Sequence, residues 1–423
     1  MEFKEAFRYL ITEFHESDLP HLQKRVFLYD DIGKIVSLIG FRRSGKTFLL
    51  YQVIDSLLES GIPLKNILYI NFEDDRLLQL KVTDLQYLLD AFYELYPELI
   101  KEQKYFFLDE VQVIDNWEVF VRRIYDKEKI KIFITGSSSK LLSREIATSL
   151  RGRTLSYEIY PLSYKEYIDF KGIQVDRNFE YSSKRYTLMK NLQMYALNGG
   201  FPEVVKNEES KSIILQNYYD LFIYKDLVDR YNIRNVNALR SLTKYLLTNL
   251  SSPFSINKYS KAHPEHDTIA RQTLMEYFSY LEEIFLIIPI KIFSYSLKVQ
   301  QVNPAKIYCI DTGLRNQVAF YFSNDIGRLM ENIVCLELIR RKKEIFYWKG
   351  KNEVDFIVKE IDNTFQAINV SYTDELAERE VLGLQEFKSK FKQNNVSLLL
   401  LSKDKIEIKG DIVIEPLWKW LLT

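Results

Sequence analysis

Cysteine is almost missing from this sequence, which has only Cys309 and Cys335 in 423 residues. Two cysteines cannot build a disulfide framework, and their separation does not match the paired spacing of a zinc site. We therefore expect both to be buried thiols in a protein of the reducing cytoplasm.

Glycine and proline are also scarce, at 14 and 10 residues, which argues against long disordered tracts. The most apolar runs, such as residues 284–290 and 396–401, are far shorter than the roughly 20 residues of a membrane helix. The first residues are charged and soon polar, unlike a secretory leader. We expect a soluble protein with no membrane partner.

An excess of charge of either sign is absent as well, because 58 Lys and Arg balance 58 Asp and Glu. The net charge therefore indicates neither a nucleic-acid nor a membrane partner, although a neutral total is compatible with one basic face. What the chain does have is apolar residues, 47% of the total. At this length they can form the cores of two or three domains.

The first part of the chain alternates short apolar β-type runs with helical stretches. This alternation predicts an α/β domain over residues 1–165, with a mostly parallel sheet and crossover helices. Runs such as Tyr-Phe-Phe-Leu are typical of strands covered on both faces. The five predicted strands are residues 35–39, 67–72, 105–108, 130–135 and 156–160.

Three further segments follow this domain. Residues 166–236 are helical, with a Gly-Gly-Phe-Pro break at 199–202. Residues 237–315 predict helices, the longest at 268–283, and then a β-ribbon around a polar turn, which is the outline of a winged helix-turn-helix. Residues 325–423 predict a separate α/β unit.

A glycine-rich motif joins the first predicted strand to the helix after it. Its sequence, Gly-Phe-Arg-Arg-Ser-Gly-Lys-Thr, fits G-x-x-x-x-G-K-[ST] in the strand–loop–helix context that the motif requires. Such a loop curls its backbone N–H groups around phosphates, while the lysine reaches the β- and γ-phosphates and the hydroxyl binds Mg²⁺. We therefore expect ATP and Mg²⁺ as cofactors. The predicted nucleotide-binding residues are Gly40, Phe41, Arg42, Arg43, Ser44, Gly45, Lys46, Thr47 and Phe48.

Two adjacent carboxylates, Asp109 and Glu110, end the third predicted strand. In sheets of this type the carboxyl ends of the strands converge on the ligand. Asp109 can bind Mg²⁺ together with Thr47, and Glu110 can act as the base for an attacking water. Gln112, just beyond, is a further candidate for positioning that water.

The fourth predicted strand ends in small hydroxyls, Thr135 and Ser137. They either reach the γ-phosphate and its attacking water or only form a turn. Arg151 and Arg153 come just before the fifth strand. One of them is a candidate arginine finger, which would stabilise transition-state charge in a neighbouring subunit of a homo-oligomer. The alternative is a solvated basic turn.

Together these residues resemble the AAA+ superfamily, and more narrowly the archaeal and bacterial AAA+ ATPases that pair this module with a C-terminal domain of unknown function. The resemblance gives Lys46 and Thr47 the phosphate and Mg²⁺ roles. It gives Asp109 and Glu110 the metal and base roles, and it implies that Arg25 lies near the adenine pocket. The resembling stretches are residues 40–47, 107–112, 135–138, 149–153, 161–167, 199–204, 224–228, 308–314 and 353–358.

The C-terminal unit resembles the layout of PD-(D/E)xK nucleases, with Glu331 on a predicted helix and Asp355 on a predicted strand. In that layout an E-x-K on the next strand completes a metal site that activates water. Asn369 and Ser371 stand at the positions of that Glu and Lys. We expect a restriction-nuclease-like fold that does not cleave; the alternative is a metal-dependent DNA nuclease coupled to ATP hydrolysis.

The partner of the winged-helix segment stays open. Arg271 near the start of the long helix can meet DNA, and the ribbon at 287–293 and 305–310 and its turn add lysines. The helix is strongly apolar further on and no dense basic cluster is present, so a domain or subunit contact is the alternative. The lysines of the ribbon and its turn are Lys291, Lys298 and Lys306.

The sequence as a whole predicts an ATP-binding and ATP-hydrolysing protein that acts as a nucleotide-driven switch or as a DNA-associated ATPase. In the second case double-stranded DNA is the partner. The predicted parts are an AAA+ core (1–165), a helical lid region (166–236), a winged helix-turn-helix (237–315) and a nuclease-like domain (325–423).

Overall fold

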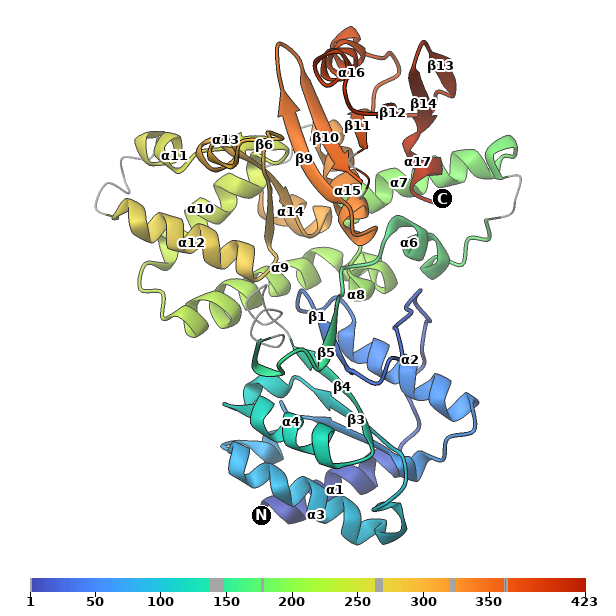
Figure 1. Ribbon diagram of the computed structural model, residues 1–423, viewed down its shortest axis with the longest axis vertical. Coiled ribbons are helices and arrows are strands. Elements are labelled where there is room, and N and C mark those ends of the chain that lie inside the picture. Colours follow the sequence, from blue (N-terminus) through green and yellow to red (C-terminus); the bar gives the residue numbers. More distant parts are fainter. Residues whose placement is uncertain are drawn as a thin grey trace. The chain divides into compact units, whose positions relative to one another are not determined.

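The computed structural model describes residues 2–136, 148–175, 179–262, 269–319, 325–360, 362 and 364–423. The chain divides into two compact units, Met1–Ile159 and Tyr160–Thr423. Their elements are labelled in Figure 1. Among the described residues, no helix is long and apolar enough to cross a membrane.

The first unit contains a five-stranded parallel sheet with the order β2-β3-β4-β1-β5. This confirms the predicted parallel α/β domain. The fifth strand begins two residues earlier than predicted, because Thr154 already pairs with Ile35 of β1. The strands are β1 Ile35–Ile39, β2 Ile67–Asn71, β3 Lys104–Asp109, β4 Ile130–Gly136 and β5 Thr154–Glu158. The described helices are α1 Phe3–Glu16, α2 Lys46–Glu59, α3 Gln86–Leu95 and α4 Trp117–Lys127.

Helices cover both faces of this sheet. Successive side chains of a strand point to opposite faces. In β1, therefore, Ile35 and Ile39 pack with side chains of α1, α3 and α4, while Val36 and Leu38 pack with α2. Figure 1 shows α1 and α3 side by side. Every residue of β1 is buried. The strand ends directly before the loop that leads to α2.

The second unit opens with helices, as predicted. The Gly-Gly-Phe-Pro break separates α7 from α8, and Gly199 adopts a φ of 79° there. Asp311 secures this break, because its carboxylate accepts hydrogen bonds from the N–H groups of Gly200 at 2.6 Å and Leu314 at 2.9 Å. The helical elements are α6 Tyr164–Phe170, α7 Lys184–Asn198, α8 Pro202–Lys206, α9 Lys211–Leu221, the π-helical turn Phe222–Asp229 and α14 Thr312–Val318.

Residues 236–309 form helices and a three-stranded antiparallel sheet with the order β6-β8-β7. The sequence did not predict the short strand β6, and a helix, α13, stands where only a polar turn was expected between the ribbon strands. The long helix begins at Arg271; its predicted first residue, Thr268, lies outside the described residues. The elements are α10 Val236–Thr248, β6 Ser252–Phe254, α11 Ile256–Ala262, α12 Arg271–Glu283, β7 Ile287–Ile290, α13 Leu297–Val302 and β8 Ala305–Cys309.

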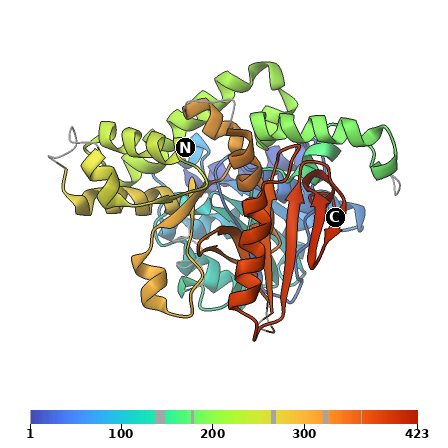
Figure 2. The ribbon, with the colours of Figure 1, turned by 90° about the horizontal axis from the view of Figure 1, so that it is seen from above.

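The C-terminal part is built on a six-stranded sheet with the order β13-β14-β12-β11-β10-β9. Helix α16 packs against β10, β11 and β12 (Figure 2). The sequence did not predict β13, β14 or α17. The elements are α15 Ile326–Arg340, β9 Glu344–Lys349, β10 Glu353–Lys359, β11 Phe365–Ser371, α16 Glu378–Lys390, β12 Val396–Ser402, β13 Glu407–Lys409, β14 Ile412–Pro416 and α17 Leu417–Trp420.

Substitution of Gly313 tests how tightly α14 packs against the Gly-Gly break. A Cβ at this position would lie 2.0 Å from the carbonyl oxygen of Asn198. We expect Gly313→Ala to destabilise the protein by roughly 1–3 kcal/mol, because backbone must move to admit the methyl group. Thermal unfolding measures this. Gly327→Ala is the matched control, since its Cβ would meet nothing within 4 Å; equal melting temperatures for the two variants would contradict the packing argument.

Candidate phosphate-binding site

The loop between β1 and α2 has a backbone that glycine makes possible. Gly40 adopts a φ of 140°, and Gly45, which precedes the first residue of α2, adopts a φ of 95°. Side chains rarely tolerate such angles. A Cβ on Gly40 would also lie 2.2 Å from the carbonyl oxygen of Ile159, so the end of β5 leaves no room for one. The loop therefore curls back to the N-terminus of α2, where N–H groups suit an anion.

Lys46 lies inside this loop. Its side chain is buried, and Nζ donates hydrogen bonds of 3.1 Å to the carbonyl oxygens of Gly40 and Phe41. The ammonium group is thus held beside the backbone that would surround a phosphate. Phe41 is itself buried, whereas Phe48 on the first turn of α2 is half exposed.

Arg25 supports the loop from outside. Its Nη1 donates to the carbonyl oxygen of Ser44 at 2.7 Å, and its backbone N–H donates to Oε1 of Gln52 at 2.8 Å. Arg25 therefore contacts the loop itself. Arg42, also in the loop, forms an ion pair with Glu73 in which Nη1 lies 3.5 Å from Oε1. Arg43 adopts a left-handed backbone with a φ of 66°.

The carboxylate of Asp109 collects hydrogen bonds from three directions. Oδ2 accepts from the hydroxyl of Thr47 at 2.8 Å and from the hydroxyl of Tyr69 at 2.9 Å, and Oδ1 accepts from Thr135. Asp109 is fully buried. Burial raises the pKa of this carboxyl above its usual range, and the hydrogen bond from Thr135 opposes that rise. The donors stabilise the charged form that a metal ion requires.

Two of the predicted metal ligands are therefore adjacent. The oxygens of Thr47 and Asp109 are 2.8 Å apart. Mg²⁺ prefers hard oxygen donors and uses one or two protein ligands beside substrate phosphates. The residues present fit that ion.

Glu110 stands directly after Asp109 in a left-handed backbone conformation, with a φ of 52°. A non-glycine residue held there stores roughly 1–3 kcal/mol of strain, and such residues gather at functional sites. Its N–H donates to the hydroxyl of Thr135 at 2.8 Å, and its Oε2 accepts from Nε2 of Gln112 at 2.5 Å. Thr135 thus links both carboxylate residues, and Gln112 orients the second.

The two candidate arginines differ in their surroundings. Arg153 makes two hydrogen bonds to the carboxylate of Asp126, at 2.8 Å and 3.1 Å. Arg151 is exposed and has a φ of 49°. Ser137, the second small hydroxyl predicted at the end of the fourth strand, lies outside the described residues.

The structure also brings together the acidic residues predicted for the C-terminal domain. Lys306 of β8 joins Glu331 of α15 to Asp355 of β10 through ion pairs of 3.0 Å and 3.1 Å. Lys306 is buried, so this lysine of the ribbon is not on the surface that could meet DNA. Asn369 instead accepts a hydrogen bond from the N–H of Asp355 at 2.9 Å.

Sequence reasoning missed Tyr69 and the true position of Lys306. Tyr69 is on β2, next to the strand that ends in Asp109, and Asn71 pairs with Asp109 in the register. A polar side chain near the carboxyl end of that neighbouring strand was the available signal. For Lys306 there was none, since its three acidic contacts come from elements 25 to 49 residues further on.

Three family models match the chain: an AAA domain over residues 33–168, a domain of unknown function (DUF8612) over 189–325, and a second one (DUF4143) over 326–420. The chain is 37% identical to an uncharacterized protein of Methanocaldococcus jannaschii, MJ1544, covering 92% of this chain and 89% of that protein. It is 32% identical to an uncharacterized protein of Haemophilus influenzae, covering 95% and 97%.

Among solved structures, the Orc1 protein of Aeropyrum pernix in complex with DNA covers 75% of this chain and 92% of that chain, with 9% identity and a TM-score of 0.29. An overlap of that size supports no conclusion about function. The match to the AAA domain and the nearly full-length relatives do identify the family. The chain belongs to the AAA+ ATPases whose C-terminal domains have no known function.

Proposed function

We propose that the first unit binds Mg-ATP and hydrolyses it, and that the protein works as a nucleotide-driven switch or as a DNA-associated ATPase. The observation on which this depends is the carboxylate of Asp109, which accepts hydrogen bonds from Thr47 of the phosphate-binding loop and from Thr135 of the neighbouring strand. Asp109 thereby links the loop proposed to bind the phosphates and the metal ion to the strand end proposed to lie near the attacking water.

The residues divide the work of hydrolysis. The N–H groups of residues 40–47 and the ammonium of Lys46 hold the phosphates, and Thr47 with Asp109 holds Mg²⁺. When bound, Mg²⁺ neutralises charge on the β- and γ-phosphates. Glu110 accepts a proton from the water that attacks the γ-phosphorus, and the bond from that phosphorus to the bridging oxygen of ADP breaks. Gln112 keeps the Glu110 carboxylate in place.

The parts of the second unit have separate proposed roles. Residues 166–236 form the lid region, and residues 237–315 form the winged helix-turn-helix. Supporting the latter is the order of the elements: β6 lies between α10 and α11, β7 and β8 follow α12, and the three strands pair as β6-β8-β7. Residues 325–423 form a nuclease-like domain. We propose that it does not cleave, since Asn369 and Ser371 supply neither the carboxylate nor the lysine of an E-x-K.

Separate substitutions of Lys46 and Glu110 distinguish ATP binding from ATP hydrolysis. We expect Lys46→Ala to abolish ATP binding, because the phosphates lose their cation. Glu110→Gln should bind ATP but turn it over about 100-fold more slowly or worse, since it cannot take the proton. A fluorescent ATP analogue and phosphate release measure the two steps. Glu102→Gln, an exposed change before the same strand, is the control; wild-type turnover by Glu110→Gln would exclude Glu110 as the base.

Tyr69→Phe removes one donor from Asp109 without opening a cavity. Because that hydrogen bond favours the carboxylate, its loss should raise the pKa of Asp109 further and increase the Mg²⁺ concentration needed for half-maximal ATPase about 10-fold. The defect should grow as the pH falls, when Asp109 takes up a proton. Titration with MgCl₂ at several pH values tests this. Tyr105→Phe, on β3, should leave the Mg²⁺ requirement unchanged, and an unchanged requirement for Tyr69→Phe would remove Tyr69 from the site.

Arg151 is our choice for the arginine finger, because Arg153 is already bound to Asp126. We expect Arg151→Ala to lower turnover about 1000-fold at concentrations where subunits associate. ATPase rate against protein concentration, run with native mass measurement, provides the comparison. Arg153→Ala is the matched variant and should retain turnover. If only Arg153→Ala loses activity, the assignment is reversed.

A further inference from the structure

A cavity of about 790 Å³ lies in the second unit, outside the ATP site. Its lining comes from β6 and β8 on one side and from α15, β10, β11 and α16 on the other. The sequence offered no reason to expect it, because these elements are spread over more than 120 residues. Acidic side chains gather at its buried floor, and basic side chains gather at its exposed rim.

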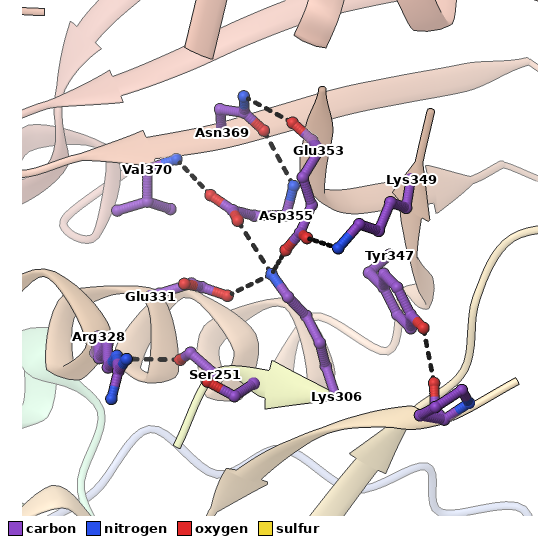
Figure 3. A network of polar contacts seen from close by, with 12 residues as sticks. Ser251, Lys306, Arg328, Glu331, Tyr347, Lys349, Glu353, Asp355, Asn369 and Val370 are labelled. Atoms are coloured by element: carbon purple, nitrogen blue, oxygen red, sulfur yellow. Dashed lines mark hydrogen bonds and ion pairs between the residues drawn. The ribbon is translucent and has the colours of Figure 1, made fainter. Parts of the chain in front are cut away.

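The floor is a buried ion cluster around Lys306 (Figure 3). Nζ lies 2.6 Å from Oε1 of Glu353, 3.0 Å from Oε1 of Glu331 and 3.1 Å from Oδ1 of Asp355. Lys306 is only 1% exposed. Three carboxylates thus converge on a single ammonium group, which the protein supplies from β8.

Lys306 occupies the place that a metal ion would need. A hard divalent cation bound by these oxygens would have to lie about 2.0–2.6 Å from each, which is the space that Nζ fills. The second oxygen of Asp355 is used as well, since Oδ2 accepts from the N–H of Val370 at 3.0 Å. Among the described residues, no group of three or more His, Cys, Asp or Glu side chains could hold a metal ion.

Burial also weakens the charge of this floor. The pKa of Glu331 is raised to about 7, because its carboxyl is buried and lies near the carboxylate of Asp355. The hydroxyl of Tyr308 donates to the same carboxyl at 2.7 Å. The ammonium group of Lys306 offsets part of the negative charge, so the floor repels an approaching anion less than three free carboxylates would.

The rim is basic. Four exposed cations come from three places: the first turn of α15, the end of β9 with the turn that follows it, and the first turn of α16. Three of them lie near an acid: Arg328 is 4.0 Å from Asp325, Lys349 is 3.7 Å from Glu353 and Arg379 is 3.0 Å from Glu380. Exposed pairs of this kind contribute little and are readily exchanged for other anions. The four residues are Arg328, Lys349, Lys351 and Arg379.

The cations are spread around the cavity. Figure 3 shows Arg328 and Lys349 on opposite sides of the Lys306 ammonium group. A single small anion cannot contact both sides at once, whereas a chain of phosphates can. Four serine and threonine hydroxyls also line the cavity, and three of them donate to backbone carbonyl oxygens of the protein. The four hydroxyls belong to Ser251, Ser252, Ser371 and Thr373.

We propose that this cavity binds the phosphodiester backbone of DNA without cutting it: the rim cations hold phosphates, and Lys306 excludes the metal ion that cleavage would need. The proposal rests on the DNA-associated form of the proposed function. It does not depend on ATP hydrolysis, so the two can fail separately.

Fluorescence anisotropy of a labelled duplex of about 20 base pairs, and of the same single strand, tests binding by the full chain without nucleotide. We expect the combined variant R328A/K349A/K351A/R379A to lose at least about 10-fold in affinity for the preferred form. The slope of log affinity against log salt should fall by about 3 to 4, at about 0.9 per duplex phosphate contact. Lys46→Ala should bind DNA like the wild type.

The matched control removes four other exposed cations of the second unit, in K258A/K261A/R271A/K291A. These residues belong to the winged-helix segment or border its sheet. We expect this variant to bind DNA normally. Loss of binding by the control while the rim variant binds normally would overturn the proposal in favour of the winged-helix segment, and no binding by the wild type would overturn it outright.

Cleavage is tested with supercoiled plasmid in Mg²⁺ and in Mn²⁺. We expect the wild type to leave the plasmid intact in both. Nicking that disappears in Asp355→Asn would show that a metal ion enters beside Lys306, and would overturn the non-cutting part of the proposal.

Discussion

The first unit depends on one buried carboxylate that must be satisfied by its surroundings. A buried acid is costly unless hydrogen bonds compensate it. At Asp109 the donors come from α2, β2 and β4, three elements that meet only if the parallel sheet has formed with β2 and β4 on either side of β3. The same contacts that make the acid tolerable therefore gather the candidate ligands at one edge. Folding and assembly of the site are a single requirement here.

The second unit solves a similar electrostatic problem differently. Around Lys306 the compensation comes from a cation of the protein itself, with three carboxylates within 3.1 Å of Nζ. The side chains that donate to Asp109 are the neutral hydroxyls of Thr47, Tyr69 and Thr135, which add no positive charge to offset its own. The two clusters differ less in their acids than in the groups that compensate them: neutral hydroxyls at Asp109 and a buried ammonium group at Glu331, Glu353 and Asp355.

Much of this could be predicted from sequence because it is local. The phosphate-binding loop occupies eight consecutive residues, and the apolar runs around it alternate with helices, so the sheet and the Asp109-Glu110 strand end followed directly. The remainder depended on contacts between distant segments. The short strand β6 has only three residues and forms because β8 lies beside it. Tyr69 acts 40 residues from Asp109, and Lys306 lies 49 residues before Asp355. No spacing rule relates such positions.

The ion cluster around Lys306 also bears on how the chain can be divided. The two family models of the second unit meet at residues 325 and 326, between the lysine and all three of its acids. A fragment that begins at that border would keep Glu331, Glu353 and Asp355 but lose their only buried ammonium group. It would leave uncompensated like charges in a shared cavity, which favours protonation or opening of the fold. The border between the two family models is a boundary of sequence similarity, and the buried ion cluster extends across it.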